Sequence, residues 1–133
     1  MKVGFIGSSE ISDFHLSAMK NNGIKVGAIG TTKNSKSCKA FAQKNNLNVE
    51  YCNNGWEEVL DKDFDAYIVC VSIKSNKDIL IKALEKNRPI FVEKPVDFEL
   101  INMQKLCEHK NAKNIFVGYN RRFYHSVSKL KYF

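Results

Sequence analysis

Short apolar segments alternate with segments of helical periodicity along the whole chain, and this alternation restricts the fold more than any other feature of the sequence. Segments typical of strands lie at residues 2–7, 24–29, 48–51, 66–71, 89–92 and 115–118. Segments typical of helices lie between and after them, at residues 10–20, 36–45, 56–60, 76–87, 97–110 and 121–133. This alternation predicts an α/β fold with a doubly wound, mostly parallel six-stranded sheet in three αβα layers.

Local patterns support a sheet that is covered on both faces. Residues 66–71 are apolar throughout, which is typical of a central strand in a parallel sheet. In the helix expected at 76–87, Leu80, Ala83 and Leu84 recur with helical spacing and should point inward. Ser35 and Asp97 are the expected N-caps of the second and fifth helices.

Length and composition exclude several classes of protein. A chain of 133 residues fits one domain. No apolar run approaches the ~20 residues that a membrane span needs, and the N-terminus lacks a signal-peptide pattern, so we expect no membrane partner and a cytoplasmic location. The four cysteines lack metal-ligand spacing, so we expect no metal site and four buried, reduced thiols: Cys38, Cys52, Cys70 and Cys107.

The basic character of the chain raises the question of nucleic-acid binding. The net charge is +7, from 21 basic and 14 acidic residues. The lysines are spread along the chain, and the aromatic residues mostly fall in apolar strands and on helix faces. This distribution favours a solvated basic surface, and we expect no nucleic-acid partner.

A lysine follows the apolar strand at 89–92. Glu93, Lys94 and Pro95 come where the strand ends and its loop begins. In open α/β sheets ligands bind beyond the carboxyl ends of the strands, so Lys94 is the candidate catalytic residue. The alternative is an ordinary strand-to-helix turn with a solvated lysine.

The turn after the first strand is a degenerate glycine-rich loop. Dinucleotide-binding folds place G-x-G-x-x-G/A here, so that backbone N–H groups at the helix N-terminus can contact a pyrophosphate. Residues 7–12 read G-S-S-E-I-S and keep only the first glycine, with small serines at the other two positions. An acidic residue at the helix start favours the helix dipole but opposes a pyrophosphate. The candidate cofactor-binding residues are Gly7, Ser8, Ser9, Glu10 and Ile11, and the alternative is a plain turn.

The end of the second strand bears on the choice of dinucleotide. An acidic residue at this point would bind the ribose hydroxyls of NAD. The chain instead has Thr31, Thr32 and Lys33 after Gly30, which suit a 2′-phosphate. We therefore expect NADP in preference to NAD if a dinucleotide binds. The alternative is that these are loop residues of a chain without a nucleotide.

Taken together, these motifs resemble the N-terminal half of the Gfo/Idh/MocA family of oxidoreductases, over nearly the whole chain. The resemblance rests on residues 2–7, on His15, on residues 38–42 (C-K-A-F-A), on residues 93–95 (E-K-P) and on residues 118–123 (G-Y-N-R-R-F). The last two motifs, ~25 residues apart with a helix between them, make the most specific pair.

The resemblance implies a two-domain protein. Residues 1–120 would form a dinucleotide-binding Rossmann domain, and residues 121–133 would begin the connection to an α+β domain that this chain lacks. The implied activity is NAD(P)-dependent hydride transfer to or from a hydroxyl-bearing carbon of a sugar, sugar nucleotide or cyclitol. The implied partners are a nicotinamide dinucleotide and a small polyhydroxylated substrate, and the complete protein would be a homo-oligomer.

The resemblance also assigns roles to single residues. Lys94 would lie near the substrate hydroxyl and help to move its proton, and Glu93 would help to fix the nicotinamide end of the site. Ser72 begins a loop that would lie beside the cofactor, although Ile73 and Lys77 replace the proline and histidine of the family's T-P-x-x-x-H stretch. Arg122 would lie near the join with the second domain, or would have a purely structural role there.

Two accounts of the chain stay open at this point. It is either the cofactor half of an oxidoreductase, which alone should turn over slowly or not at all, or a stand-alone Rossmann module without its own catalysis. A module of that kind would need an apolar surface closed by self-association.

Overall fold

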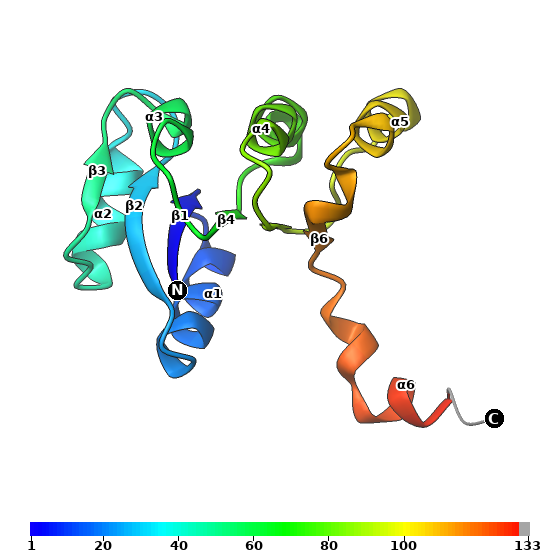
Figure 1. Cartoon of the computed structure of the whole chain (residues 1–133). Coiled ribbons are helices and arrows are strands. Elements are labelled where there is room, and N and C mark those ends of the chain that lie inside the picture. Colours follow the sequence, from blue (N-terminus) through cyan, green and yellow to red (C-terminus); the bar gives the residue numbers. More distant parts are fainter. Residues whose placement is uncertain (131–133) are drawn as a thin grey trace.

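The computed structural model describes residues 1–130 and confirms the six-stranded, doubly wound sheet (Figure 1). The strands are β1 (Lys2–Ile6), β2 (Lys25–Gly30), β3 (Glu50–Cys52), β4 (Ala66–Val69), β5 (Ile90–Val92) and β6 (Ile115–Val117). The α-helices are α1 (Glu10–Asn21), α2 (Lys36–Lys44), α3 (Trp56–Leu60), α4 (Ile73–Glu85), α5 (Leu100–Glu108) and α6 (His125–Leu130). Two short 3₁₀ helices are η1 (Ala112–Asn114) and η2 (Asn120–Phe123).

The strand order places a switch point at the centre of the sheet. All pairs are parallel and the order is β3-β2-β1-β4-β5-β6. The chain winds outward from β1 in one direction and from β4 in the other. Because β1 and β4 are neighbours, the loops that follow them diverge to opposite faces, which opens a crevice at their carboxyl ends.

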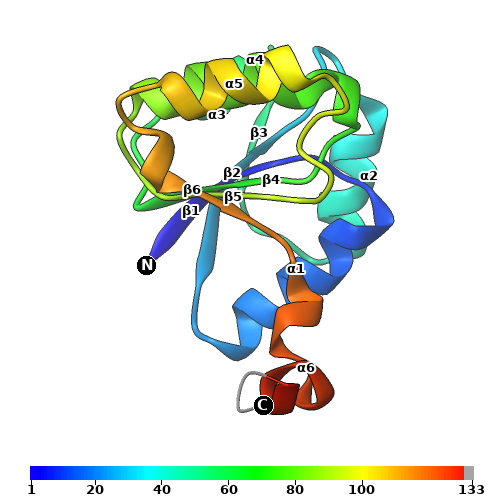
Figure 2. The ribbon, with the colours of Figure 1, turned by 90° about the vertical axis from the view of Figure 1, so that its right-hand side faces the viewer.

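Helices cover the two faces of the sheet unequally (Figure 2). Helices α3, α4 and α5 pack on one face, and α1 and α2 pack on the other. On the first face, Ile79, Leu80, Ala83 and Leu84 of α4 are buried, which confirms the inward positions expected for that helix. On the second face the helices reach β1, β2, β3 and β4, whereas β6 is only partly buried.

The N-terminal ends of two helices differ from the sequence-based expectations. Helix α4 begins at Ile73, one turn earlier than expected, with Ser72 as its N-cap residue. Helix α5 has Glu99, not Asp97, at its N-cap. Asp97 instead accepts hydrogen bonds from the backbone N–H of Glu99 (2.8 Å) and from the Asn102 amide (3.1 Å), and the first of these lowers its pKa most. Its carboxylate thus orders the turn before the helix.

The expected last helix is divided. Helix η2 ends at Phe123, Tyr124 is extended (φ −66°, ψ 139°), and α6 then runs from His125 to Leu130. The rest of the segment expected to be helical, residues 131–133, lies outside the described residues. Within residues 1–130, no helix combines the length and apolar content that crossing a membrane requires.

Three of the four cysteines are buried, as expected. Cys38, Cys52 and Cys70 are 5%, 3% and 1% exposed. The expectation for Cys107 was wrong, because α5 turns only its neighbour Leu106 fully into the core and leaves Cys107 on the solvent side. Burial raises the pKa of the Cys52 thiol to about 11 and that of Cys70 to about 12.

Alkylation should therefore distinguish the cysteines of the native chain. We expect a limiting amount of iodoacetamide at pH 8 to modify Cys107 first, because the thiolate is the reactive form and Cys70 is both buried and protonated. Peptide mass spectrometry after timed quenching measures the order, and labelling in denaturant serves as the control. Equal rates at Cys70 and Cys107 in the native chain would contradict this packing.

Candidate functional site

The loops at the switch point border an open cavity of about 350 Å³. Six of its lining residues were predicted from the sequence to bind a cofactor: Gly7, Ser8, Ser9, Thr31, Thr32 and Ser72. Trp56, the first residue of α3, also lines this cavity, although no sequence pattern marked it as a site residue. We refer to it below as the turn cavity.

Gly7 sets the shape of the turn cavity. Its φ of +126° is a conformation that side chains rarely adopt, and a Cβ atom at this position would overlap the carbonyl oxygen of Cys70. The Gly7 N–H also donates a hydrogen bond to the Gly30 carbonyl (3.0 Å). The first loop therefore lies directly against the ends of β2 and β4.

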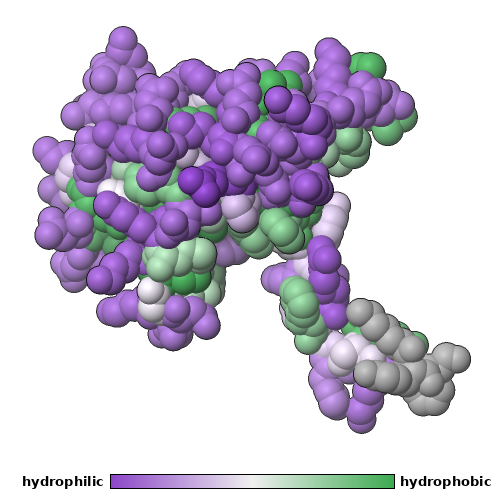
Figure 3. All heavy atoms as spheres, in the orientation of Figure 1, coloured by the Kyte–Doolittle hydropathy of each residue, from purple (hydrophilic) through white to green (hydrophobic). Residues whose placement is uncertain are grey.

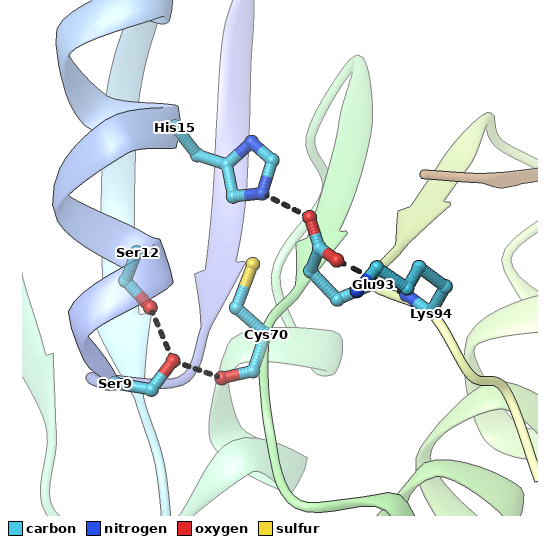
Figure 4. Close-up of polar contacts among 6 residues, drawn as sticks. All are labelled: Ser9, Ser12, His15, Cys70, Glu93 and Lys94. Carbon is cyan, nitrogen blue, oxygen red and sulfur yellow. Dashed lines mark hydrogen bonds and ion pairs between the residues drawn. The ribbon is translucent and has the colours of Figure 1, made fainter. Parts of the chain in front are cut away.

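Serine hydroxyls occupy the positions of the two missing glycines (Figure 4). Ser9 Oγ lies 3.3 Å from Ser12 Oγ and donates to the Cys70 carbonyl at 3.4 Å. Ser12 is completely buried at the start of α1. The degenerate turn is thus closed by side-chain hydrogen bonds, and the first turn of α1 still packs against the sheet.

Hydroxyl groups dominate the side of the turn cavity next to β2. The Thr31 hydroxyl oxygen is buried and has no hydrogen-bond partner among the described residues. Ser8 Oγ lies 3.0 Å from Ser37 Oγ in the first turn of α2, and Ser35 caps that helix by accepting from the Cys38 N–H, as expected. Within residues 1–130, no carboxylate lines this cavity.

Lys33 and Glu10, also predicted to bind a cofactor, lie outside the turn cavity. Both are exposed. Ile11 also points elsewhere, into a groove between α1 and β6. A contribution of Glu10 and Ile11 to cofactor binding would therefore have to come from their backbone groups.

The loop after β5 presents Lys94 at the same edge of the sheet (Figure 4). Lys94 is exposed, and its backbone N–H donates to Glu93 Oε2 at 3.1 Å. The other carboxylate oxygen of Glu93 lies 2.7 Å from His15 Nε2 in α1. Glu93 therefore connects α1 to the loop that carries the lysine.

A buried asparagine holds the same loop from the other face of the sheet. Asn76 of α4 is 2% exposed, and its amide donates to the carbonyls of Val96 (2.9 Å) and Pro95 (3.3 Å). The sequence predicted Asn76 as the first residue of the helix at 76–87 and gave no partner for its side chain. An amide side chain facing inward on an apolar helix face was the available signal.

The second hollow is an open groove of about 910 Å³ between α1 and β6. His15, Glu93 and Arg122 line it, together with aromatic residues from both sides. Arg122 donates to the carbonyls of Tyr119 (3.0 Å) and Val117 (3.2 Å). These bonds give Arg122 a structural role after β6, while its contact with a cofactor stays a prediction.

The described residues 1–130 contain no cluster of three or more His, Cys, Asp or Glu side chains placed to hold a metal ion. The polar groups that line the turn cavity are hydroxyls and backbone amides, and the loop after β5 adds the Lys94 ammonium nearby. That set suits phosphate and hydroxyl groups, which accept and donate hydrogen bonds.

Comparison with known families and structures is consistent with this geometry. Residues 1–120 match the Gfo/Idh/MocA family model, an oxidoreductase family with an NAD-binding Rossmann fold. Over 134 residues the chain is 26% identical to the myo-inositol 2-dehydrogenase of Thermotoga maritima, covering 98% of this chain and 40% of that protein. Over 136 residues it is 26% identical to the inositol 2-dehydrogenase of Salmonella typhimurium, with the same coverage.

Solved structures give the same match. A myo-inositol dehydrogenase from Lactobacillus casei, in complex with NAD(H) and myo-inositol, superimposes with a TM-score of 0.84 and 25% identity. The match covers 99% of this chain and 40% of that one. The chain therefore spans about 40% of the length of these relatives.

The Gly7 turn can be tested by substitution. Gly7→Ala should lower the free energy of unfolding by about 2–4 kcal/mol, because the added Cβ meets the Cys70 carbonyl in a strained backbone. Gly23→Ala is the matched control, since Gly23 also has positive φ (+66°) but open space around it, and should cost about 1 kcal/mol. Urea unfolding measures both, and equal losses would show that contact with Cys70 does not constrain the turn.

Proposed function

Since this chain belongs to the Gfo/Idh/MocA oxidoreductase family and contains its NAD-binding Rossmann fold, we propose that it is the cofactor-binding half of an NAD(P)-dependent oxidoreductase. The complete enzyme transfers hydride to or from a hydroxyl-bearing carbon of a small polyhydroxylated molecule, in the class of sugars, sugar nucleotides and cyclitols. The observation that carries this proposal is the turn cavity, in which the Gly7 loop and the β2 loop meet at the switch point of the sheet.

The residues of the turn cavity fit a dinucleotide. Gly7 leaves the space that a Cβ would fill, and the loop leads into the N-terminus of the 12-residue helix α1. The backbone N–H groups of Ser8, Ser9 and the first turn of α1 would hold the pyrophosphate there. The unpaired buried hydroxyl of Thr31 supplies a further hydrogen-bonding group at the ribose end.

The finer proposal is a preference for NADP over NAD. The β2 loop offers Thr31, Thr32 and Lys33, and no carboxylate lines the cavity within residues 1–130 to bind ribose hydroxyls or to repel a 2′-phosphate. Lys33 lies outside the cavity, on the exposed side of the loop. Its long side chain would have to turn inward to reach the phosphate.

Lys94 is the proposed catalytic residue. The dinucleotide, when bound, supplies the acceptor or donor of hydride. Lys94 orients the substrate hydroxyl and moves the proton at its oxygen, while Glu93 and Asn76 hold the backbone on each side of the lysine. Ser72 lies at the cavity wall beside Gly7, where the cofactor would pass from one loop to the next.

A second domain explains the exposed apolar residues at the C-terminal end. Phe123 and Leu130 are 80% and 70% exposed, η2 and α6 bury no residue, and Figure 3 shows hydrophobic residues along this segment. We propose that residues 1–120 form the Rossmann domain and that residues 121–133 begin the connection to an α+β domain, which also carries the contacts of a homo-oligomer. Four free cysteines support a cytoplasmic location.

The alternative is a stand-alone dinucleotide-binding module whose apolar C-terminal segment is covered by self-association. The two accounts predict different gene sequences downstream of the Phe133 codon. A coding region with an α+β pattern supports the enzyme, and an immediate stop codon supports the module.

Calorimetric titration of this chain with NADPH, NADH and ADP-ribose tests the cofactor proposal. We expect all three to bind, with NADPH ahead of NADH, and we expect Lys33→Ala to reduce this preference. Lys36→Ala, a neighbouring exposed lysine, is the control. A preference for NADH would overturn the 2′-phosphate proposal and keep the function, whereas binding of none of the three would count against the function itself.

Substitution of the lysine tests the proposed chemistry. In the enzyme that carries both halves, Lys94→Ala should lower kcat by roughly 10²- to 10⁴-fold, as for loss of a general acid or base, and should change cofactor affinity much less. Steady-state kinetics and cofactor titration on the same preparations separate the two effects. Unchanged turnover would remove Lys94 from the mechanism.

A further inference from the structure

His15 joins α1 to the loop after β5. Its Nε2 atom lies 2.7 Å from Glu93 Oε1, across 78 positions of sequence (Figure 4). His15 belongs to α1, the helix whose N-terminus borders the turn cavity, and Glu93 belongs to the loop that presents Lys94. The contact therefore spans the space between the two parts of the candidate site.

Glu93 makes a second hydrogen bond, to the backbone of Lys94. A carboxylate accepts hydrogen bonds at both oxygens, so the Glu93 side chain can bridge two donors. Oε1 faces the imidazole of His15, and Oε2 accepts the backbone N–H of Lys94 at 3.1 Å. His15 is thus linked to Lys94 through one side chain.

Neighbouring residues restrict the His15 and Glu93 side chains. The His15 ring packs edge-on against Phe91, with 4.9 Å between ring centroids. Gly118 closes the other side, because a Cβ there would lie 2.9 Å from the Phe91 ring and 3.2 Å from Glu93 Oε1. The His15 and Glu93 side chains are only 22% and 18% exposed, so water competes weakly for their hydrogen bond.

We propose that His15 is a positioning residue for Lys94, which acts by fixing the Glu93 carboxylate and through it the backbone of the lysine loop. This inference rests on the proposed function, in which the loop forms the nicotinamide end of the site. With the loop already ordered, binding at that end costs less conformational entropy. The adenosine end, formed by the turn cavity, does not depend on this contact.

The competing explanation is that the bond merely attaches α1 to the sheet. That role would affect global stability and would act equally on both ends of the site. A positioning role instead predicts effects at Lys94 and at the nicotinamide end alone. Three variants separate the two: His15→Leu removes the donor, His15→Gln keeps an N–H donor at similar reach, and Ser17→Ala is an exposed control on the same helix.

The first measurement is exchange of the Lys94 backbone amide with water, observed by NMR in the chain without ligand. We expect exchange to be roughly tenfold faster in His15→Leu, because the Glu93 carboxylate loses the partner that orients it. In His15→Gln and Ser17→Ala we expect exchange to be nearly unchanged. Amides in the centre of β1 report global stability in the same spectra. Faster exchange at β1 and Lys94 alike, or unchanged exchange at Lys94, would overturn the proposal.

The second measurement compares two ligands by calorimetry. NADH reaches both ends of the site, whereas ADP-ribose lacks the nicotinamide. We expect His15→Leu to weaken NADH binding by roughly three- to tenfold and to leave ADP-ribose binding within about twofold, with recovery in His15→Gln. Equal weakening of both ligands would assign His15 to the scaffold only.

The two measurements also separate this inference from the proposed function. If the unsubstituted chain bound neither ligand, the proposed function would fail, and amide exchange would still decide whether His15 holds the Lys94 loop. If ligands bound and exchange at Lys94 did not respond to His15→Leu, the function would stand and the positioning role would fall.

Discussion

The close approach of the first loop to the end of β4 is the contact on which this edge of the sheet depends. Gly7 has a positive φ, and no side chain fits between its Cα and the Cys70 carbonyl. The same approach brings the Gly7 N–H to the Gly30 carbonyl and the Ser9 hydroxyl to Cys70. Backbone groups at the ends of β1, β2 and β4 therefore meet in one small volume. The hydroxyls of Ser9 and Ser12 close the turn at the two positions where the motif would have glycine.

The sheet could be predicted because short-range rules determine it. Residues 66–71 are apolar throughout, and Ala66–Val69 within this run form the central strand β4. The inward spacing of Leu80 and Leu84 matches the face of α4 that is buried. Gly7 could be identified because a tight turn after a strand demands glycine. These features depend on residues that are near one another in sequence, so they can be recognised before the fold is known.

The contacts that organise the site could not be predicted in this way, because they join residues far apart in sequence. Nothing near Glu93 indicates His15 as its partner, and nothing near Pro95 indicates Asn76. Trp56 lines the turn cavity, and the loop before it is bonded to the loop after β2 through the Asn34 N–H and the Asn53 carbonyl (2.8 Å). Asp97 illustrates a local failure: its carboxylate satisfies the turn before α5 and leaves the capping position to Glu99.

The unequal covering of the sheet affects which strand opens most readily. Strand β1 is buried from Val3 to Ile6, whereas every residue of β6 is partly or largely exposed and pairs only with β5 in the described sheet. Since fewer buried contacts hold it, β6 should open locally at a lower free energy than β1. The β6 wall of the groove between α1 and β6 should therefore open more readily than the Gly7 turn, which lies against the buried centre of the sheet.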